Sequence, residues 1–189
     1  MAEEVTKFTA IYDRFLGKIT DDMYMELTPE DTIRDLQSLI IDAIPGFEFP
    51  RKNLSNYNVE TITVDKKDLK EDDFVINDLL DDESSVLVDR SSFGVELTSE
   101  EINILAILMM NAWLQRQVTS IENTRMKYSG TDFKMTSQAN HLAKLQSLLN
   151  EVQRQSHHMQ RLYKRRKTDS EGNITSNWSV LREVSTFDY

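Results

Sequence analysis

The segment INILAILMMNAWL, residues 102–114, decides the fold predicted for this chain. Its apolar side chains fall on nearly every face of a helix rather than on one stripe. Such a helix is normally buried by neighbouring elements on several sides, so it lies at the centre of a domain. Just before it, Thr98 and Glu101 have the spacing of a capping box, a pattern that starts helices. The sequence therefore predicts a central helix that begins after Thr98.

This helix is expected to continue to about Met126 and to be followed by a second long helix. Residues 115–128 are largely polar, which indicates that the first helix leaves the core and extends outward. After a break at Ser129 and Gly130, a seam steps by three and four residues; it consists of Leu142, Leu145, Leu149, Val152, Ser156, Met159 and Tyr163. A seam of three heptads is short for an independent coiled coil, which favours antiparallel packing onto the preceding helix.

The N-terminal part predicts two further helices. The first rests on a spacing of three, four and three residues among Val5, Phe8, Tyr12 and Phe15. The second has Thr28 as its cap and Pro29 at the first helical position, and it stops at Pro45. Its expected buried stripe is Ile33, Leu36, Ile40 and Ile44.

Residues 53–97 differ in character and indicate a strand-containing insertion. VETITV at 59–64 alternates as a half-buried strand does, and FVI at 74–76 and VLV at 86–88 are short apolar runs. Helical turns around residues 78–82 remain an alternative. The predicted fold class is mainly α: a helical bundle with long antiparallel helices, a small strand or hairpin insertion and an extended C-terminal arm. We divide the chain into a helical domain, residues 1–167, and an arm, residues 168–189.

Composition limits the classes of function. The 189 residues include five glycines, three prolines and no cysteine, which excludes disulfides, thiolate nucleophiles and cysteine-ligated metals. No apolar window is long enough to cross a bilayer, and the first residues do not form a signal peptide. We expect a soluble intracellular protein with no membrane partner.

Charge is unevenly distributed along the chain. Residues 1–100 hold 10 Lys and Arg against 24 Asp and Glu, whereas residues 101–189 hold 12 against 8. This asymmetry suggests two surfaces of opposite sign, although solvated faces that differ by chance explain it equally well.

The search for an active site finds no catalytic constellation. Of the three histidines, His157 and His158 are adjacent on a helix and point in different directions, and His141 lies four turns away. The acidic stretch at 65–83 lacks the glycine of a calcium loop, and no glycine-rich phosphate loop is present. We expect no metal, no cofactor and no enzymatic activity.

A basic cluster ends the last helix. It consists of Arg161, Lys164, Arg165, Arg166 and Lys167. These side chains can contact phosphates, complement the negative end of the helix dipole, or pair with an acidic patch on another copy of the chain. The first of these is the least favoured, because a free DNA-binding protein normally has a larger basic footprint and a recognition helix.

The C-terminal stretch is rich in apolar and aromatic residues, namely Ile174, Trp178, Leu181, Val184, Phe187 and Tyr189. Terminal segments are usually frayed unless something holds them. Docking on a neighbouring protein and docking on the chain's own core remain equal alternatives.

The order of these parts resembles a known family. The helical unit YDRFLGKITDDMYMELTPEDTIRDLQSLIIDAIPGFEFP, residues 12–50, is followed by the strand insertion, two long helices with a basic end, and an aromatic tail. This layout looks like that of the head–tail connector, or adaptor, proteins of tailed bacteriophages. The resemblance covers most of the chain and concerns layout rather than a short signature.

The resemblance implies a structural virion protein, assembled in the bacterial host cytoplasm and located at the head–tail interface. Such adaptors form a ring, commonly of twelve copies, beneath the portal protein, and they continue the DNA channel toward a tail-side neck or tail completion protein. DNA passes through without specific binding.

The resemblance also implies roles for residue sets of this chain. The aromatic tail would be the portal-docking arm, and the basic cluster would contact a neighbouring subunit or phosphate. An acidic set would line the channel or meet the next ring; it consists of Asp65, Asp68, Glu71, Asp72, Asp73, Asp81, Asp82 and Glu83. Carboxylates suit a channel lining because they repel phosphates.

Two other interpretations stay open. The first is a small helical regulator that binds nucleic acid through residues 161–167. The second is a soluble interaction module unrelated to phages.

Overall fold

The computed structural model describes residues 5–19, 23–70, 73–75, 85–127, 136–168 and 174–175, which form a mainly helical chain with small antiparallel sheets. The helices are α1 (Thr9–Leu16), α2 (Met23–Glu26), α3 (Pro29–Ala43), α4 (Ser99–Lys127) and α5 (Thr136–Arg165). The strands are β1 (Thr6–Lys7), β2 (Tyr57–Asn58), β3 (Thr61–Asp65), β4 (Phe74–Val75), β5 (Ser85–Asp89), β6 (Ser92–Phe93), β7 (Lys167–Thr168) and β8 (Ile174–Thr175). The expected mainly α chain with a few short strands is confirmed.

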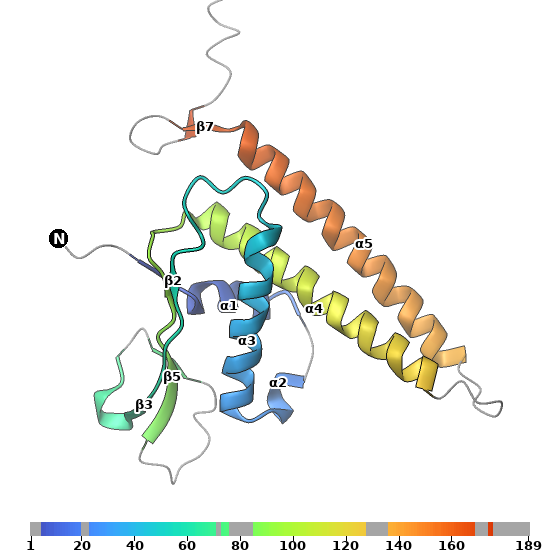
Figure 1. The fold of residues 1–189 in the computed structure, drawn as a ribbon, viewed down its shortest axis with the longest axis horizontal. Helices are drawn as coiled ribbons and strands as arrows, with labels where there is room; N and C mark the ends of the chain where they lie inside the picture. The colour runs from blue at the N-terminus through green and yellow to red at the C-terminus, as the bar shows by residue number, and fades with distance from the viewer. Residues whose placement is uncertain are drawn as a thin grey trace, which may run out of the picture.

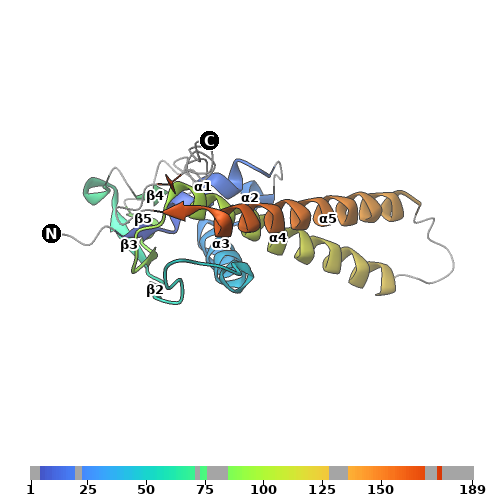
Figure 2. The same cartoon turned by 90° about the horizontal axis from the view of Figure 1, so that it is seen from above.

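The first half of α4 is the centre of the molecule. Residues 104–109 are all buried, and α4 packs against α1, α3 and α5. Figure 1 shows α4 between α3 and α5, and Figures 1 and 2 together show α4 and α5 side by side. The burial follows from the sequence, because a helix that is apolar on all sides is stable in water only when several neighbours cover it.

The second half of α4 is more polar and remains tied to α3. Gln115 and Thr119 are exposed, whereas Arg116 forms ion pairs with Asp35 (2.9 Å) and Asp42 (2.5 Å) on α3. Arg116 therefore ties this part of α4 to α3, and the apolar Val118 two residues later is also buried.

The helix α3 begins as predicted. The Thr28 hydroxyl accepts a hydrogen bond from the Asp31 N–H (3.2 Å), and Pro29 is the first helical residue. Its buried face is Thr32, Ile33, Leu36, Leu39, Ile40 and Ala43. Ile44, which the sequence placed in this stripe, is half-buried in a short 3-10 turn (Ile44–Gly46) that follows the helix.

The first helix is shorter than its spacing predicted. α1 begins at Thr9, and Val5 lies outside the helix with 46% of its surface exposed. Phe8 is fully buried just before α1, where its ring packs against Phe93 with 4.8 Å between centroids. Phe8 thus packs against β6, which is distant in the sequence, instead of forming part of a first helical turn.

The strands connect both ends of the predicted insertion to the N-terminal segment. One sheet has the order β1-β6-β2, so β1 from the chain start pairs with β6, and a second sheet has the order β3-β5-β4. The strand predicted at 59–64 is β3, and it pairs antiparallel with β5. Tyr12 of α1 donates a hydrogen bond to Asp89 at the end of β5 (3.1 Å), and burial raises the pKa of Tyr12 well above its ordinary value. The described strands of this insertion are therefore joined to the helical core through β1 and through the hydrogen bond between Tyr12 and Asp89.

The predicted seam of α5 faces the body. Leu142, Val152, Ser156 and Tyr163 are buried, and the other three seam residues are half-buried. Ile107 and Leu114 of α4 form one apolar cluster with Val152. The polar seam residue Ser156 is satisfied by the Gln160 side-chain amide at 3.2 Å. The helix begins at Thr136.

We predict that Leu105→Ala lowers the free energy of unfolding by about 2–5 kcal/mol, because it removes a fully buried side chain and leaves a cavity in α4. The matched control is Leu162→Ala on α5, where the leucine is 40% exposed and the loss should be about 1 kcal/mol or less. Chemical denaturation of both variants measures the difference. Equal losses would contradict the central position of α4.

Candidate functional site

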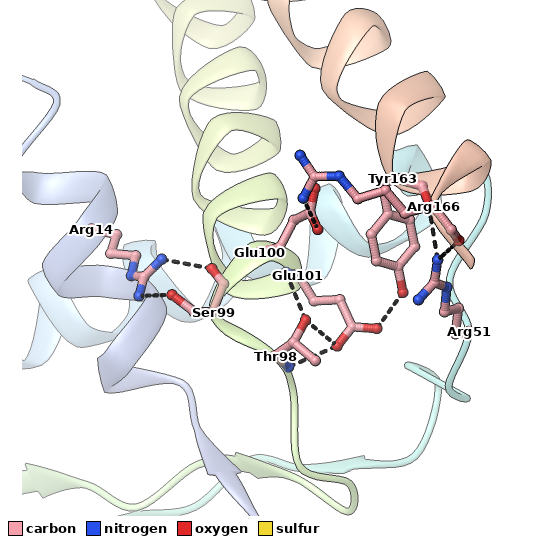
Figure 3. A network of polar contacts seen from close by, with 8 residues as sticks. All are labelled: Arg14, Arg51, Thr98, Ser99, Glu100, Glu101, Tyr163 and Arg166. Atoms are coloured by element: carbon pink, nitrogen blue, oxygen red, sulfur yellow. Dashed lines mark hydrogen bonds and ion pairs between the residues drawn. The ribbon is translucent and has the colours of Figure 1, made fainter. Parts of the chain in front are cut away.

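The C-terminal end of α5 is attached to the N-terminal end of α4 by buried hydrogen bonds (Figure 3). The Tyr163 hydroxyl donates to the Glu101 carboxylate at 2.5 Å, and both residues are only 2% exposed. The same carboxylate accepts hydrogen bonds from the Thr98 N–H (2.7 Å) and the Thr98 hydroxyl (2.9 Å). The Glu101 N–H in turn donates to Thr98 Oγ1 at 3.3 Å, which completes the predicted capping box.

The electrostatics of this contact keep Tyr163 protonated. Burial raises the pKa of Tyr163 well above its ordinary value of 10.0, and the hydrogen bond to Glu101 raises it further. A tyrosine that stays protonated remains a donor to the carboxylate. Glu101 also lies in the first turn of α4, where the helix dipole favours a negative charge.

Arg51 also binds the C-terminal end of α5. Its guanidinium lies 4.5 Å from the centre of the Tyr163 ring and donates to the backbone carbonyls of Tyr163 (3.0 Å) and Arg166 (2.5 Å). These carbonyls belong to the end of the helix, where intrahelical donors are lacking. A cation there also complements the negative end of the dipole.

The basic cluster divides into two groups. Lys164 lies 3.9 Å from the centre of the Phe49 ring, and Arg166 pairs with Glu100 at 2.8 Å. Arg161 and Arg165 are exposed and have no hydrogen bond or ion pair with any residue that the structure describes. Lys167 begins β7, which pairs with β8.

A second polar contact fixes the preceding turn of α5 to residues 46–48. The Gln160 side chain donates to the Gly46 carbonyl (3.2 Å) and accepts from the Glu48 N–H (2.7 Å). His157 lies 3.3 Å from the Glu48 carboxylate on the exposed side. The last two turns of α5 therefore have a single defined position on the body.

The acidic set is only partly described. Asp65 and Asp68 are exposed near the end of β3, beside the exposed residues Lys67 and Lys70. The Asp73 side chain is 1% exposed and pairs with Arg90 at 3.1 Å, and this hydrogen bond holds the pKa of Asp73 below its usual value. Asp73 is thus engaged within the chain rather than presented to solvent. The remaining members, Glu71, Asp72, Asp81, Asp82 and Glu83, lie outside the described residues.

Of the predicted docking arm, the structure describes only the first residue. Ile174 lies in β8 opposite Thr168 of β7, so the chain turns back on itself directly after α5. Trp178, Leu181, Val184, Phe187 and Tyr189 lie outside the described residues.

Sequence reasoning missed the partners that hold α5. Arg51 and Tyr163 are separated by 112 residues, and no local pattern at either position indicates their contact. Glu101 was found only as a capping residue, although it also binds Tyr163. Ser156, the polar residue of the seam, was the one available signal of such contacts. A buried polar side chain needs hydrogen-bond partners.

The described part of the chain was searched for metal sites and membrane-spanning helices. In that part, no group of three or more histidine, aspartate or glutamate side chains is arranged to hold a metal ion. None of the helices there has both the length and the apolar content required to cross a bilayer.

We predict that Tyr163→Phe lowers the free energy of unfolding by about 1–3 kcal/mol at neutral pH, because the buried Glu101 carboxylate loses a donor. The unfolded chain releases the tyrosine proton near pH 10, whereas the folded chain keeps it. The contribution of Tyr163 is therefore complete below that pH and declines above it, and the variant should lose stability less steeply in alkali.

The matched control is Tyr57→Phe, because the Tyr57 hydroxyl has no hydrogen-bond partner among the residues described. Denaturation curves at several pH values measure both variants. Identical pH dependence in Tyr163→Phe and the unchanged protein would contradict the buried contact with Glu101.

Comparison with known proteins gives no relative: no protein-family model, no curated protein and no solved structure matches this chain.

Proposed function

We propose that this protein is a structural virion component, a ring-forming adaptor that joins the portal protein of a capsid to the tail and continues the DNA channel. The observation that carries the proposal is the fixed end of α5. Tyr163, Glu101 and Arg51 hold that end on the body, and the β7–β8 pair follows at once. A segment that starts from a fixed point reaches a partner with less loss of conformational entropy than one that starts from a mobile helix.

The arm is the proposed portal contact. Residues 176–189 follow directly after β8, and they carry Trp178, Leu181, Val184, Phe187 and Tyr189. Aromatic side chains are favoured anchors of protein interfaces. In the proposal, the arm binds the portal protein while the body stays unchanged.

The body would form the wall of the ring as an antiparallel bundle of long helices. Support comes from the side-by-side packing of α4 and α5 and from the residues that remain free for a neighbour. Arg161 and Arg165 would face acidic side chains of an adjacent copy. A head-to-tail ring requires two different complementary patches on each subunit.

The acidic segment at 65–83 is the proposed lining of the channel or contact to the next ring. It holds nine acids against three lysines. Of the described members, Asp65 and Asp68 are exposed and suited to this role, whereas Asp73 is not. Carboxylates along a channel repel phosphates, so DNA slides without binding specifically. The tail-side partner would be a neck or tail completion protein.

We predict that deleting residues 176–189 abolishes co-sedimentation with portal rings and leaves the thermal unfolding midpoint unchanged. This truncation keeps the β7–β8 pair, so the end of α5 is not disturbed. The control is the full chain with Arg161→Gln and Arg165→Gln, which should retain portal binding. Unchanged docking of the truncated protein would refute the assignment of the arm.

Nucleic-acid binding is the second candidate, favoured by Arg161 and Arg165, which are exposed and form no ion pair with the residues that the structure describes. Lys164 and Arg166 contact the protein itself, which reduces the basic footprint available for phosphates. We therefore expect no duplex DNA binding at physiological salt, measured by fluorescence anisotropy over a salt series. Tight binding that weakens steeply with salt and is lost in Arg161→Gln/Arg165→Gln would favour the regulator instead.

A further inference from the structure

The outer face of α5 carries a stripe of arginines. Arg154, Arg161 and Arg165 recur after seven and four residues, so they lie on one side of the helix, and all three are exposed. Val152 and Tyr163, two residues before the first and last of them, are buried, and two residues turn a helix by about 200°. The three arginines, which we call the arginine stripe, therefore point away from the body.

A stripe of the opposite sign runs along α3. Asp31, Asp35 and Asp42 recur after four and seven residues, and we call them the aspartate stripe. The side chains of Asp31 and Asp42 are 52% and 53% exposed, and that of Asp35 is 29% exposed. The whole of α3 holds four acids against one arginine, whereas α5 holds five Lys and Arg against one Glu. The two helices are therefore complementary in charge.

Ion pairs within the chain leave the aspartate stripe with negative charge in excess. The carboxylates of Asp35 and Asp42 share Arg116. At the start of α3, Asp31 and the preceding glutamate share Arg34. Each arginine thus neutralises one of two acids. Because a carboxylate can accept several hydrogen bonds, the aspartates can bind a further cation.

The two stripes have the same spacing in opposite directions along the chain. Eleven residues, about 16 Å of helix, separate the first and last members of each stripe. In an antiparallel alignment with Arg165 beside Asp31, the middle and far members of the two stripes also come side by side. A parallel alignment instead places His158 beside Asp35, so it matches only two of the three arginines. The antiparallel alignment is the better match of charge.

The two stripes cannot meet within one copy. Arg116 of α4 contacts α3, whereas Leu114 belongs to the apolar cluster with Val152 of α5. These two residues of α4 are about 200° apart around the helix, so α3 and α5 lie on opposite sides of α4 (Figure 1). A contact between the stripes therefore joins two copies. Contacts between different patches on identical subunits are heterologous, and they close into rings when the rotation permits.

We propose that the arginine stripe of one copy binds the aspartate stripe of a second copy, with α5 and α3 antiparallel. The inference rests on the proposed ring and deepens it by naming the two surfaces that meet. Charge pairs across an interface fix its register and accelerate association, and their effect falls as the salt concentration rises.

Two charge-reversal variants test the two surfaces, Arg161→Glu/Arg165→Glu on α5 and Asp31→Lys/Asp42→Lys on α3. Each alone should weaken self-association by about tenfold or more in analytical ultracentrifugation at low salt. An equimolar mixture should associate again, because the reversed α5 of one variant then meets the reversed α3 of the other. A monomeric unchanged chain, unaltered association of the α3 variant, or no recovery in the mixture would overturn the proposal.

The matched control is Lys144→Glu, which reverses an exposed cation of α5 outside the stripe. It should leave self-association unchanged, and a loss equal to that of Arg165→Glu would overturn the proposal. The α3 variant loses ion pairs within the chain, so its thermal unfolding is measured as well. If it does not fold, Asp31→Asn/Asp42→Asn takes its place, with the same weakening expected.

The direction of the helices is tested by cross-linking, because the chain has no cysteine of its own. Glu30→Cys at the start of α3 is mixed with Leu162→Cys or with Gln155→Cys, and all three positions are exposed. The antiparallel contact brings the start of α3 to the end of α5. A short thiol cross-linker should therefore join Glu30→Cys to Leu162→Cys in higher yield. A higher yield with Gln155→Cys would overturn the proposal.

Portal binding is measured separately from self-association. Self-association through both stripes without portal binding rejects only the proposed adaptor. Portal binding with unaltered self-association of the charge-reversal variants rejects only this interface.

Discussion

The burial of the first half of α4 is the constraint on which the rest of the structure depends. Residues 104–109 are buried without interruption, so this helix needs cover on several sides. The helices α1, α3 and α5 supply it, and each contributes one apolar face. Every other feature is placed relative to this helix, including the strands that pair with the chain start and the end of α5.

A single carboxylate links this core to the C-terminal part of the chain. Glu101 starts α4 through Thr98 and holds the end of α5 through Tyr163. Because a buried carboxylate is costly unless its oxygens have donors, the cap and the tertiary contact support each other. Arg51 adds a third attachment through the carbonyls at the end of the helix. The start of the C-terminal segment is thereby fixed relative to α4.

The basic cluster at the end of α5 has more than one role in this acidic protein. Lys164 and Arg166 help to hold α5 on the body, and Arg161 and Arg165 remain exposed. Lys164 and Arg166 therefore contribute to the fold, whereas Arg161 and Arg165 form no ion pair with the residues that the structure describes.

The sequence by itself determined the starts of α3 and α4 and most of the buried faces of α3 and α5, whereas it did not give α2 or the start of α1. The capping box at Thr98, the cap at Thr28 and the seam from Leu142 to Tyr163 are local patterns, and local backbone geometry is sufficient to predict them. The partners across the chain were decided only by the tertiary structure. Arg51 with Tyr163, Asp73 with Arg90, and β1 with β6 join residues whose contact depends on how the whole core packs, and no spacing along the chain records that packing.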